Sequence, residues 1–133
     1  IKFVLIAPNE LQVPDYIIKD VLEPSGAKYV QVESMDAVMP DLDILYMTRI
    51  QRERFFSAEE YLKYENAFIL DLDKLQNAKN DLTIMHPLPR VNEIATEVDD
   101  DPRAKYFEQA LNGKYVRMAL IMTLLKWGGQ LEY

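Results

Sequence analysis

Apolar residues in this chain gather in short runs, and the segments between the runs repeat their apolar residues at helical spacing. The first run, Lys2–Ala7, stops at Pro8 and is typical of a strand buried on both faces. Four further runs have the length of strands. They are Tyr29–Val32, Asp43–Met47, Ala67–Leu70 and Thr83–Met85. The pattern therefore predicts about five strands.

Most of the predicted helices have a start or stop signal of known physical origin. In chain order, these are a helix opened by Pro14 and ended by Pro24-Ser25-Gly26, a short helix Met35–Met39 capped by Ser34 and stopped by Pro40, a helix capped by Ser57 with Glu60 three places later, one or two turns around Leu72–Lys79, and a helical region opened by Pro102. Asn112-Gly113 is expected to break or kink this last region before a strongly apolar helix, Tyr115–Lys126.

Alternation of strands and helices indicates an α/β fold, a three-layer Rossmann-like parallel sheet of about five strands flanked by helices. We expect residues 1–133 to form a single domain. The helix Tyr115–Lys126 is apolar on more than one side, which is an excess for a small domain. Two explanations stay open: deep burial in its own core, or packing on a neighbouring domain outside this chain.

Composition narrows the class of protein. Hydrophobic residues make up 49% of the chain and charged residues 28%, which is ordinary for a globular protein, and no apolar run is long enough to span a membrane. The net charge of −7 argues against nucleic-acid binding but allows a local cationic pocket. Cysteine is absent, which is compatible with a cytoplasmic protein. The chain opens on Ile1 within a predicted strand, so we expect it to be part of a longer polypeptide.

The strongest candidate for chemistry is the proline turn, which we define as His86–Ile94. It holds the only histidine and follows a strand, at the place where open α/β sheets bind ligands. Prolines at 87 and 89 fix the backbone, so the carbonyl oxygens of Pro87 and Leu88 keep a constant direction and can accept hydrogen bonds from a substrate. The alternative is a rigid connector with a packed imidazole.

A second candidate is the loop Thr48–Arg54, after the strand Asp43–Met47. In extended backbone Arg49 and Gln51 point to one side, and a guanidinium beside a carboxamide suits a carboxylate. The alternative is a solvated loop whose charges pair with each other. No phosphate loop, zinc site or nucleophile elbow is recognisable, so no cofactor or metal is expected. The Asp99–Asp101 run is expected to cap the helix near Pro102.

Three stretches together resemble aspartate carbamoyltransferase. They are Tyr46–Arg54, His86–Ile94, and Lys105–Ala110 with Asn112-Gly113. The resemblance covers essentially the whole chain but only the carboxyl-terminal, aspartate-binding half of that enzyme's catalytic chain. It implies transfer of a carbamoyl group from carbamoyl phosphate to the amine of L-aspartate in pyrimidine biosynthesis. Ornithine-specific relatives carry a Cys in the turn after the His, where this chain has Pro87.

By this resemblance, Arg49 and Gln51 would bind the aspartate carboxylates, and the carbonyls of Pro87 and Leu88 would hold the carbamoyl amide and the attacking amine. The Leu88-Pro89 bond is expected to be cis. Supporting roles fall to His86, Pro89, Arg90, Arg54, Tyr61, Asn92 and Glu93. The segment from Arg52 to about Tyr64 resembles a loop that moves on closure. Asn92 stands where many relatives have Asp, so a contact with Tyr61 would lose a charge.

The resemblance also implies partners. The amino-terminal domain, with its Ser-Thr-Arg-Thr phosphate-binding motif, is missing from this sequence, and the family forms a catalytic homotrimer whose subunits share active sites. This chain alone is therefore expected to be inactive. Whether regulatory chains join the complete enzyme stays open. The rival hypothesis is a non-catalytic small-molecule binding or interaction module that keeps the same fold.

Overall fold

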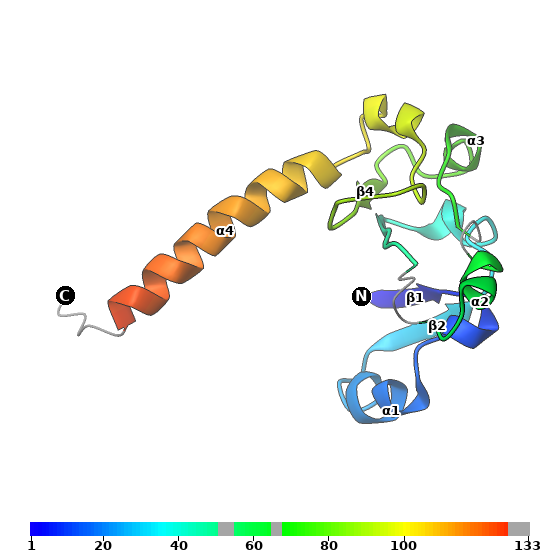
Figure 1. Ribbon diagram of the computed structural model, residues 1–133, viewed down its shortest axis with the longest axis horizontal. Helices are drawn as coiled ribbons and strands as arrows, with labels where there is room; N and C mark the ends of the chain where they lie inside the picture. Colours follow the sequence, from blue (N-terminus) through cyan, green and yellow to red (C-terminus); the bar gives the residue numbers. More distant parts are fainter. Residues whose placement is uncertain (51–54, 65–67, 128–133) are drawn as a thin grey trace.

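The computed structural model describes residues 1–50, 55–64 and 68–127 (Figure 1). Within these ranges four strands form two parallel pairs. Strand β1 (Lys2–Ile6) pairs with β2 (Lys28–Val32), and β3 (Ile44–Tyr46) pairs with β4 (Thr83–Met85). The α/β class and the parallel pairing are confirmed.

The prediction of about five strands in one sheet is too high for the described residues. In the run Ala67–Leu70, Leu70 forms a single bridge with Ile94. Its N–H donates to the Glu93 carbonyl at 2.9 Å, and the Ala95 N–H donates to the Leu70 carbonyl at 2.9 Å. The N–H groups of Val91 and Asn92, which precede this bridge in the proline turn, donate to the Glu93 carboxylate at 3.0 and 3.1 Å and not to a neighbouring strand.

The prediction that the first strand is buried on both faces is wrong, because Phe3 in β1 is 44% exposed. The helix expected after Pro14 is too short to cover it. It consists of α1 (Asp15–Ile17) continued by a π-helical turn, Ile18–Leu22, and its only buried residue is Ile18. Gly26, with φ +68°, reverses the chain after the helix, as the predicted stop requires.

Most other helices are single turns. Helix α2 spans Ala58–Leu62 and α3 spans Leu72–Leu75. The Asp71 carboxylate caps α3 by accepting a hydrogen bond from the Lys74 N–H at 2.9 Å. The Ser34 hydroxyl accepts from the Ala37 N–H at 3.3 Å, as expected of a cap. However, Pro40 does not end a helix as expected, because it lies inside a 3₁₀ helix, Met39–Asp41.

Helix α4 (Tyr106–Trp127) is one continuous helix of 22 residues, so the break expected at Asn112-Gly113 is wrong. A single internal glycine costs about 1 kcal/mol, which the strong helix formers around it offset. The start expected at Pro102 is also wrong. A 3₁₀ helix, Thr96–Asp100, precedes α4, and the Asp101 carboxylate is bound by the Arg103 side chain instead of capping α4.

The core lies beneath β3, β4 and the proline turn. Its buried residues are Met35, Met39, Leu42, Leu45, Met47, Leu70, Leu75, Leu82, Ile84, Ile94, Val98 and Tyr106. Burial of each large side chain stabilises the fold by roughly 2 kcal/mol. The two candidate loops are therefore mounted on the best-packed part of the molecule.

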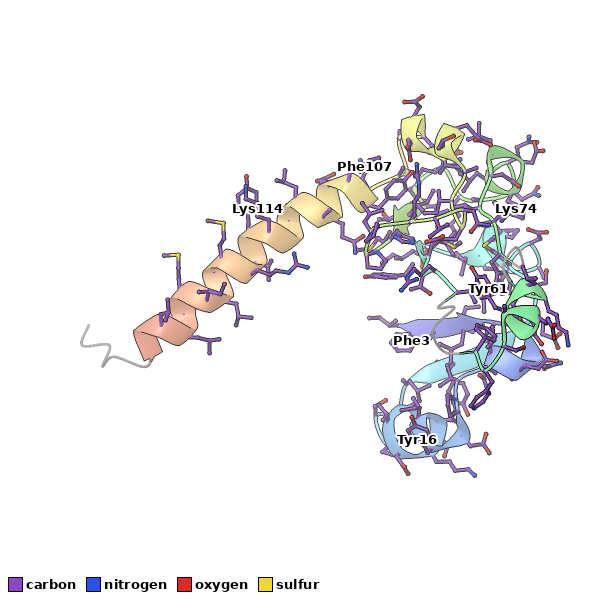
Figure 2. All side chains as sticks on the ribbon, in the orientation of Figure 1. Phe3, Tyr16, Tyr61, Lys74, Phe107 and Lys114 are labelled. Atoms are coloured by element: carbon purple, nitrogen blue, oxygen red, sulfur yellow. The ribbon has the colours of Figure 1, made fainter. Side chains whose placement is uncertain are left out.

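Helix α4 leaves this core and projects from the body (Figures 1 and 2). Apolar side chains along it, from Leu111 to Leu125, are 50% to 74% exposed. Deep burial of the helix in its own core, one of the two explanations left open by the sequence, is therefore wrong. Over the described residues, no helix is long and apolar enough to cross a bilayer.

Candidate functional site

The two candidate loops leave the same edge of one parallel pair of strands. Tyr46 of β3 lies opposite Met85 of β4, and the Met47 N–H donates to the Met85 carbonyl at 2.8 Å. Because both strands end here, Thr48 and His86 start their loops side by side. The strands that precede the two candidate loops are therefore direct neighbours.

The proline turn is built around the His86 ring, which is 1% exposed. Its Nδ1 accepts a hydrogen bond from the Leu88 N–H at 2.8 Å, and its Nε2 lies 2.7 Å from Glu93 Oε1. Since Nδ1 is the acceptor, the ring proton is on Nε2 and is donated to the carboxylate. His86 therefore joins the start of the turn to its end.

The Glu93 carboxylate closes this frame. Its Oε2 accepts from the N–H groups of Val91 and Asn92 at 3.0 and 3.1 Å. Burial works to raise the pKa of Glu93, but the backbone donors and the His86 ring outweigh it and hold the pKa below its ordinary value. The carboxylate is thus ionised and fully engaged in holding the turn.

Leu88 carries the backbone distortion of the turn. Its φ is +47°, and the Leu88–Pro89 peptide bond is cis, as the resemblance implied. A left-handed conformation at a non-glycine residue costs roughly 1 kcal/mol and persists only where the surroundings impose it. Here the bond from the Leu88 N–H to His86 helps to impose it. The carbonyl groups on either side of Leu88 are consequently fixed in direction.

Arg90 is held by a second polar cluster, which sequence reasoning did not foresee. Its guanidinium forms a two-pronged pair with the Asp99 carboxylate and lies 5.6 Å from the centre of the Tyr106 ring. The hydrogen bond from Arg90, then that from the Tyr106 hydroxyl, lowers the pKa of Asp99 to about 2. Burial, followed by the contact with Asp99, raises the pKa of Tyr106 to about 12.

This cluster predicts an acid-sensitive contribution to stability. The pKa of Asp99 falls from 3.8 to about 2 on folding, so the carboxylate stabilises the fold fully above pH 5 and loses its effect as the pH falls through 3.8 towards 2. We expect about 1 kcal/mol, because solvent screens a pair whose carboxylate is 28% exposed.

The substitution Asp99→Asn should therefore lower the thermal midpoint of the complete catalytic chain at pH 6, and the gap from wild type should narrow at pH 3. Asp20→Asn, which neutralises an exposed carboxylate, is the control and should leave both midpoints within error. A gap of equal size at both values of pH would contradict the role given to the Asp99 carboxylate.

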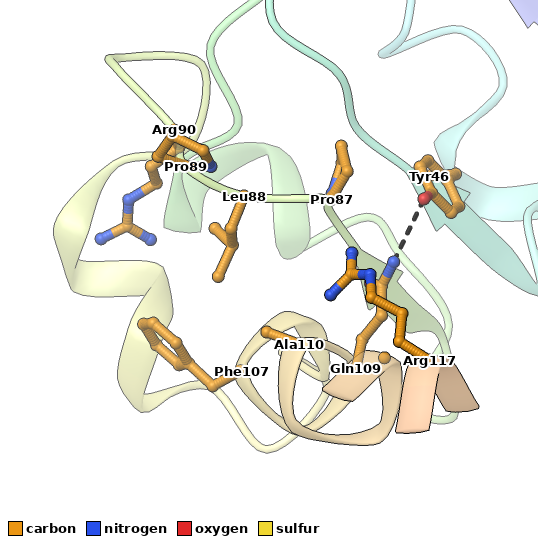
Figure 3. Close-up of a pocket in the computed structure, with 10 residues that line it drawn as sticks. Tyr46, Pro87, Leu88, Pro89, Arg90, Phe107, Gln109, Ala110 and Arg117 are labelled. Carbon is orange, nitrogen blue, oxygen red and sulfur yellow. Dashed lines mark hydrogen bonds between the residues drawn. The ribbon is translucent and has the colours of Figure 1, made fainter. Parts of the chain in front are cut away.

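A cavity of about 700 Å³ lies between the proline turn and the first turns of α4 (Figure 3). Pro87, Leu88 and Arg90 line one side of it. Gln109 and Arg117 extend into it from α4, and sequence reasoning gave neither of them a role. A signal was present, since the two polar residues are eight positions apart and so share one face of the helix.

The other predicted residues lie at the far end of the turn. Arg49 and Tyr61 line a small cavity of about 30 Å³ together with Asn92 and Glu93. Arg49 thus faces the end of the proline turn, whereas Pro87 and Leu88 face the larger cavity at its start. Gln51 and Arg54 lie outside the described residues. Within the described ranges, no three His, Asp or Glu side chains are grouped to hold a metal ion.

The sequence matches the family model for the Asp/Orn binding domain of aspartate/ornithine carbamoyltransferase over residues 1–124. The chain belongs to this family. A catalytic subunit of aspartate carbamoyltransferase from Lachnoclostridium phytofermentans is 58% identical over 125 residues, and one from Clostridium botulinum is 55% identical over 124. These alignments cover 94% and 93% of this chain but 41% and 40% of the relatives.

Solved structures of the family share the fold. The catalytic subunit of M. jannaschii aspartate transcarbamoylase aligns over 94% of this chain and 41% of its own, with a TM-score of 0.82 and 41% identity. The Trypanosoma cruzi enzyme in complex with carbamoyl phosphate and aspartate aligns over 90% of this chain and 40% of its own, with a TM-score of 0.80 and 36% identity. This chain therefore spans about two fifths of the length of the family members that it matches.

In a member of the carbamoyltransferase family, the hydrogen bonds that hold the proline turn are relevant to substrate binding. A buried network of His86, Leu88 and Glu93 fixes the backbone that lines the larger cavity. This arrangement can present two carbonyl acceptors to a bound amide or amine without rearranging during a reaction.

Proposed function

We propose that this chain is the aspartate-binding half of an aspartate carbamoyltransferase, which transfers the carbamoyl group of carbamoyl phosphate to L-aspartate in pyrimidine biosynthesis. The observation that carries the proposal is the rigid turn with its two directed carbonyl groups at Pro87 and Leu88, beside a cavity. The curated relatives named as catalytic subunits of that enzyme, at 58% and 55% identity, give further support.

In the proposed reaction, the α-amine of aspartate attacks the carbamoyl carbon. A C–N bond forms, the bond from carbon to the phosphate oxygen breaks, phosphate leaves with the electron pair, and the amine loses a proton. The carbonyls of Pro87 and Leu88 accept hydrogen bonds from the carbamoyl amide and the amine. Arg49 and Gln51 bind the carboxylates of aspartate, the first by paired charge-assisted hydrogen bonds. Holding both substrates in line supplies much of the rate enhancement.

The proposal includes the rest of the enzyme. Carbamoyl phosphate binds mainly to an amino-terminal domain outside this chain, and the exposed apolar side chains of α4 pack against that domain. The assembly is a cytoplasmic homotrimer of complete catalytic chains. The alternative, a binding module without catalysis, would leave the apolar side of α4 without a covering domain.

The proposal is tested with the complete catalytic chain. We expect carbamoyl aspartate to form from carbamoyl phosphate and L-aspartate, and no citrulline to form when L-ornithine replaces aspartate. Product would be measured with radiolabelled carbamoyl phosphate, and the oligomeric state by sedimentation. An assembled trimer that makes no carbamoyl aspartate would favour the binding module, and comparable rates with ornithine would overturn the assignment of aspartate.

A further inference from the structure

Gln109 forms a bridge between three elements of the fold. It lies in the first turn of α4, where its N–H donates to the Lys105 carbonyl at 2.8 Å. Its side-chain oxygen Oε1 accepts a hydrogen bond from the His86 N–H at 3.0 Å, and its Nε2 donates to the Tyr46 hydroxyl at 3.1 Å (Figure 3). One carboxamide thus joins the helix, the first residue of the proline turn and the last residue of β3.

The hydrogen bond from the His86 N–H to Gln109 attaches the first residue of the proline turn to α4. The bonds from His86 to Leu88 and Glu93 are internal to the proline turn, so they fix its shape. The end of the turn is attached to the body through Leu70, which pairs with Ile94. The start is attached by β4 and by the bond from the His86 N–H to Gln109. Gln109 is therefore one of the contacts that set where a turn of fixed shape lies.

We propose that Gln109 is a positioning residue, which sets the carbonyl groups of Pro87 and Leu88 relative to the substrates and couples their position to α4. The inference rests on the proposed function, in which these two carbonyls touch the carbamoyl amide and the amine. Gln109 acts through His86, and Tyr46 holds the carboxamide in the orientation that places Oε1 towards the His86 N–H. Without Tyr46, the amide retains its bond to His86 but loses its second anchor.

A positioning role predicts an effect on kcat without an equal effect on the KM for aspartate. Displacing the carbonyls misaligns the amine and the carbamoyl carbon, which lowers kcat, because small errors of alignment slow a reaction between bound substrates. The aspartate carboxylates are held elsewhere, by the loop that contains Arg49, so the KM for aspartate should change little. A purely structural role for Gln109 would lower the amount of folded enzyme without this separation.

The test uses the complete catalytic chain with Gln109→Met, which keeps the length of the side chain and removes both hydrogen bonds. We expect kcat to fall about 10- to 100-fold with the KM for aspartate within about threefold of wild type. Tyr46→Phe should lower kcat by severalfold, and in the double variant it should cause no further loss. The control is Gln76→Met, the same change at an exposed residue whose side chain donates to the Asp73 carboxylate, and it should behave as wild type.

Hydrogen exchange gives a readout that does not depend on activity. The His86 amide should exchange slowly in wild type and in Gln109→Glu, which keeps an acceptor for it, and quickly in Gln109→Met. If Gln109→Met fails to fold, Tyr46→Phe carries the kinetic test and Gln109→Glu the exchange test. Unchanged kcat in the variants, or a raised KM at normal kcat, would overturn the inference. An inactive wild type would instead refute the proposed function, and the exchange measurement would still report on Gln109.

Discussion

Replacing Arg49 by alanine in the complete catalytic chain should raise the KM for L-aspartate by about 100-fold or more. The side chain lines a small cavity at the end of the proline turn, beside Asn92 and Glu93. In the proposed complex its guanidinium meets a substrate carboxylate that closure removes from water. Loss of such a partner costs on the order of 3 kcal/mol, and each 1.4 kcal/mol corresponds to a factor of ten in binding.

Two further variants sharpen this measurement. Arg49→Lys retains the charge but loses the planar fork, so its KM should fall between those of wild type and Arg49→Ala. Lys19→Ala removes one positive charge from an exposed position in the π-helical turn Ile18–Leu22 and should leave the KM unchanged. The KM for carbamoyl phosphate should stay close to wild type in all three. An aspartate KM near normal in Arg49→Ala would refute the role given to this residue.

Replacing Glu93 by glutamine should destabilise the protein although the side chain keeps its shape. The Glu93 carboxylate accepts hydrogen bonds from His86 on one oxygen and from two backbone N–H groups on the other. A carboxamide has only one acceptor oxygen, so its NH₂ group must face a donor in either orientation. Moving the His86 proton to Nδ1 gives no relief, because Nδ1 faces the Leu88 N–H. We expect a loss of about 2 kcal/mol.

The loss would be measured as a fall of roughly 5 °C in the thermal midpoint of the complete chain. It should be accompanied by a lower kcat, because the same network shapes the proline turn. Glu97→Gln is the matched control, since it removes the same charge from an exposed residue four positions later in the chain. Equal midpoints for the two variants would show that the Glu93 carboxylate is not needed to hold the turn.

Local sequence signals predicted where the strands lie better than they predicted where the helices end. The strands at Lys2–Ile6, Lys28–Val32, Ile44–Tyr46 and Thr83–Met85 fall where apolar runs predicted them. Of the run expected at Ala67–Leu70, the described part forms only the bridge between Leu70 and Ile94, and the N–H groups of Val91 and Asn92 beside that bridge donate to the Glu93 carboxylate. Single punctuating residues were the least reliable signals. Pro40 and Gly113 lie within helical segments, where the residues around them outweigh a penalty that acts at one position.

The site shows a similar division. Proline spacing pointed to the rigid turn at His86–Ile94, and the order of strands brought it next to the Arg49 loop. Partnerships between distant side chains could not be read from one sequence. The pairing of Arg90 with Asp99 and the bridge made by Gln109 depend on how Tyr106 and the start of α4 pack beneath the turn. Such contacts have no periodicity, so only the folded chain reveals them.

The length of α4 gives it a mechanical property. At 1.5 Å per residue, its 22 residues make a rod of about 33 Å whose base carries Gln109. For a rod of that length, a sideways movement of about 3 Å at the far end tilts the base by only about 5°. A protein surface that binds the distal turns of α4 would therefore move the base of the helix by much less than it moves the far end. Coarse motion at one end of the helix would become sub-ångström adjustment at the other.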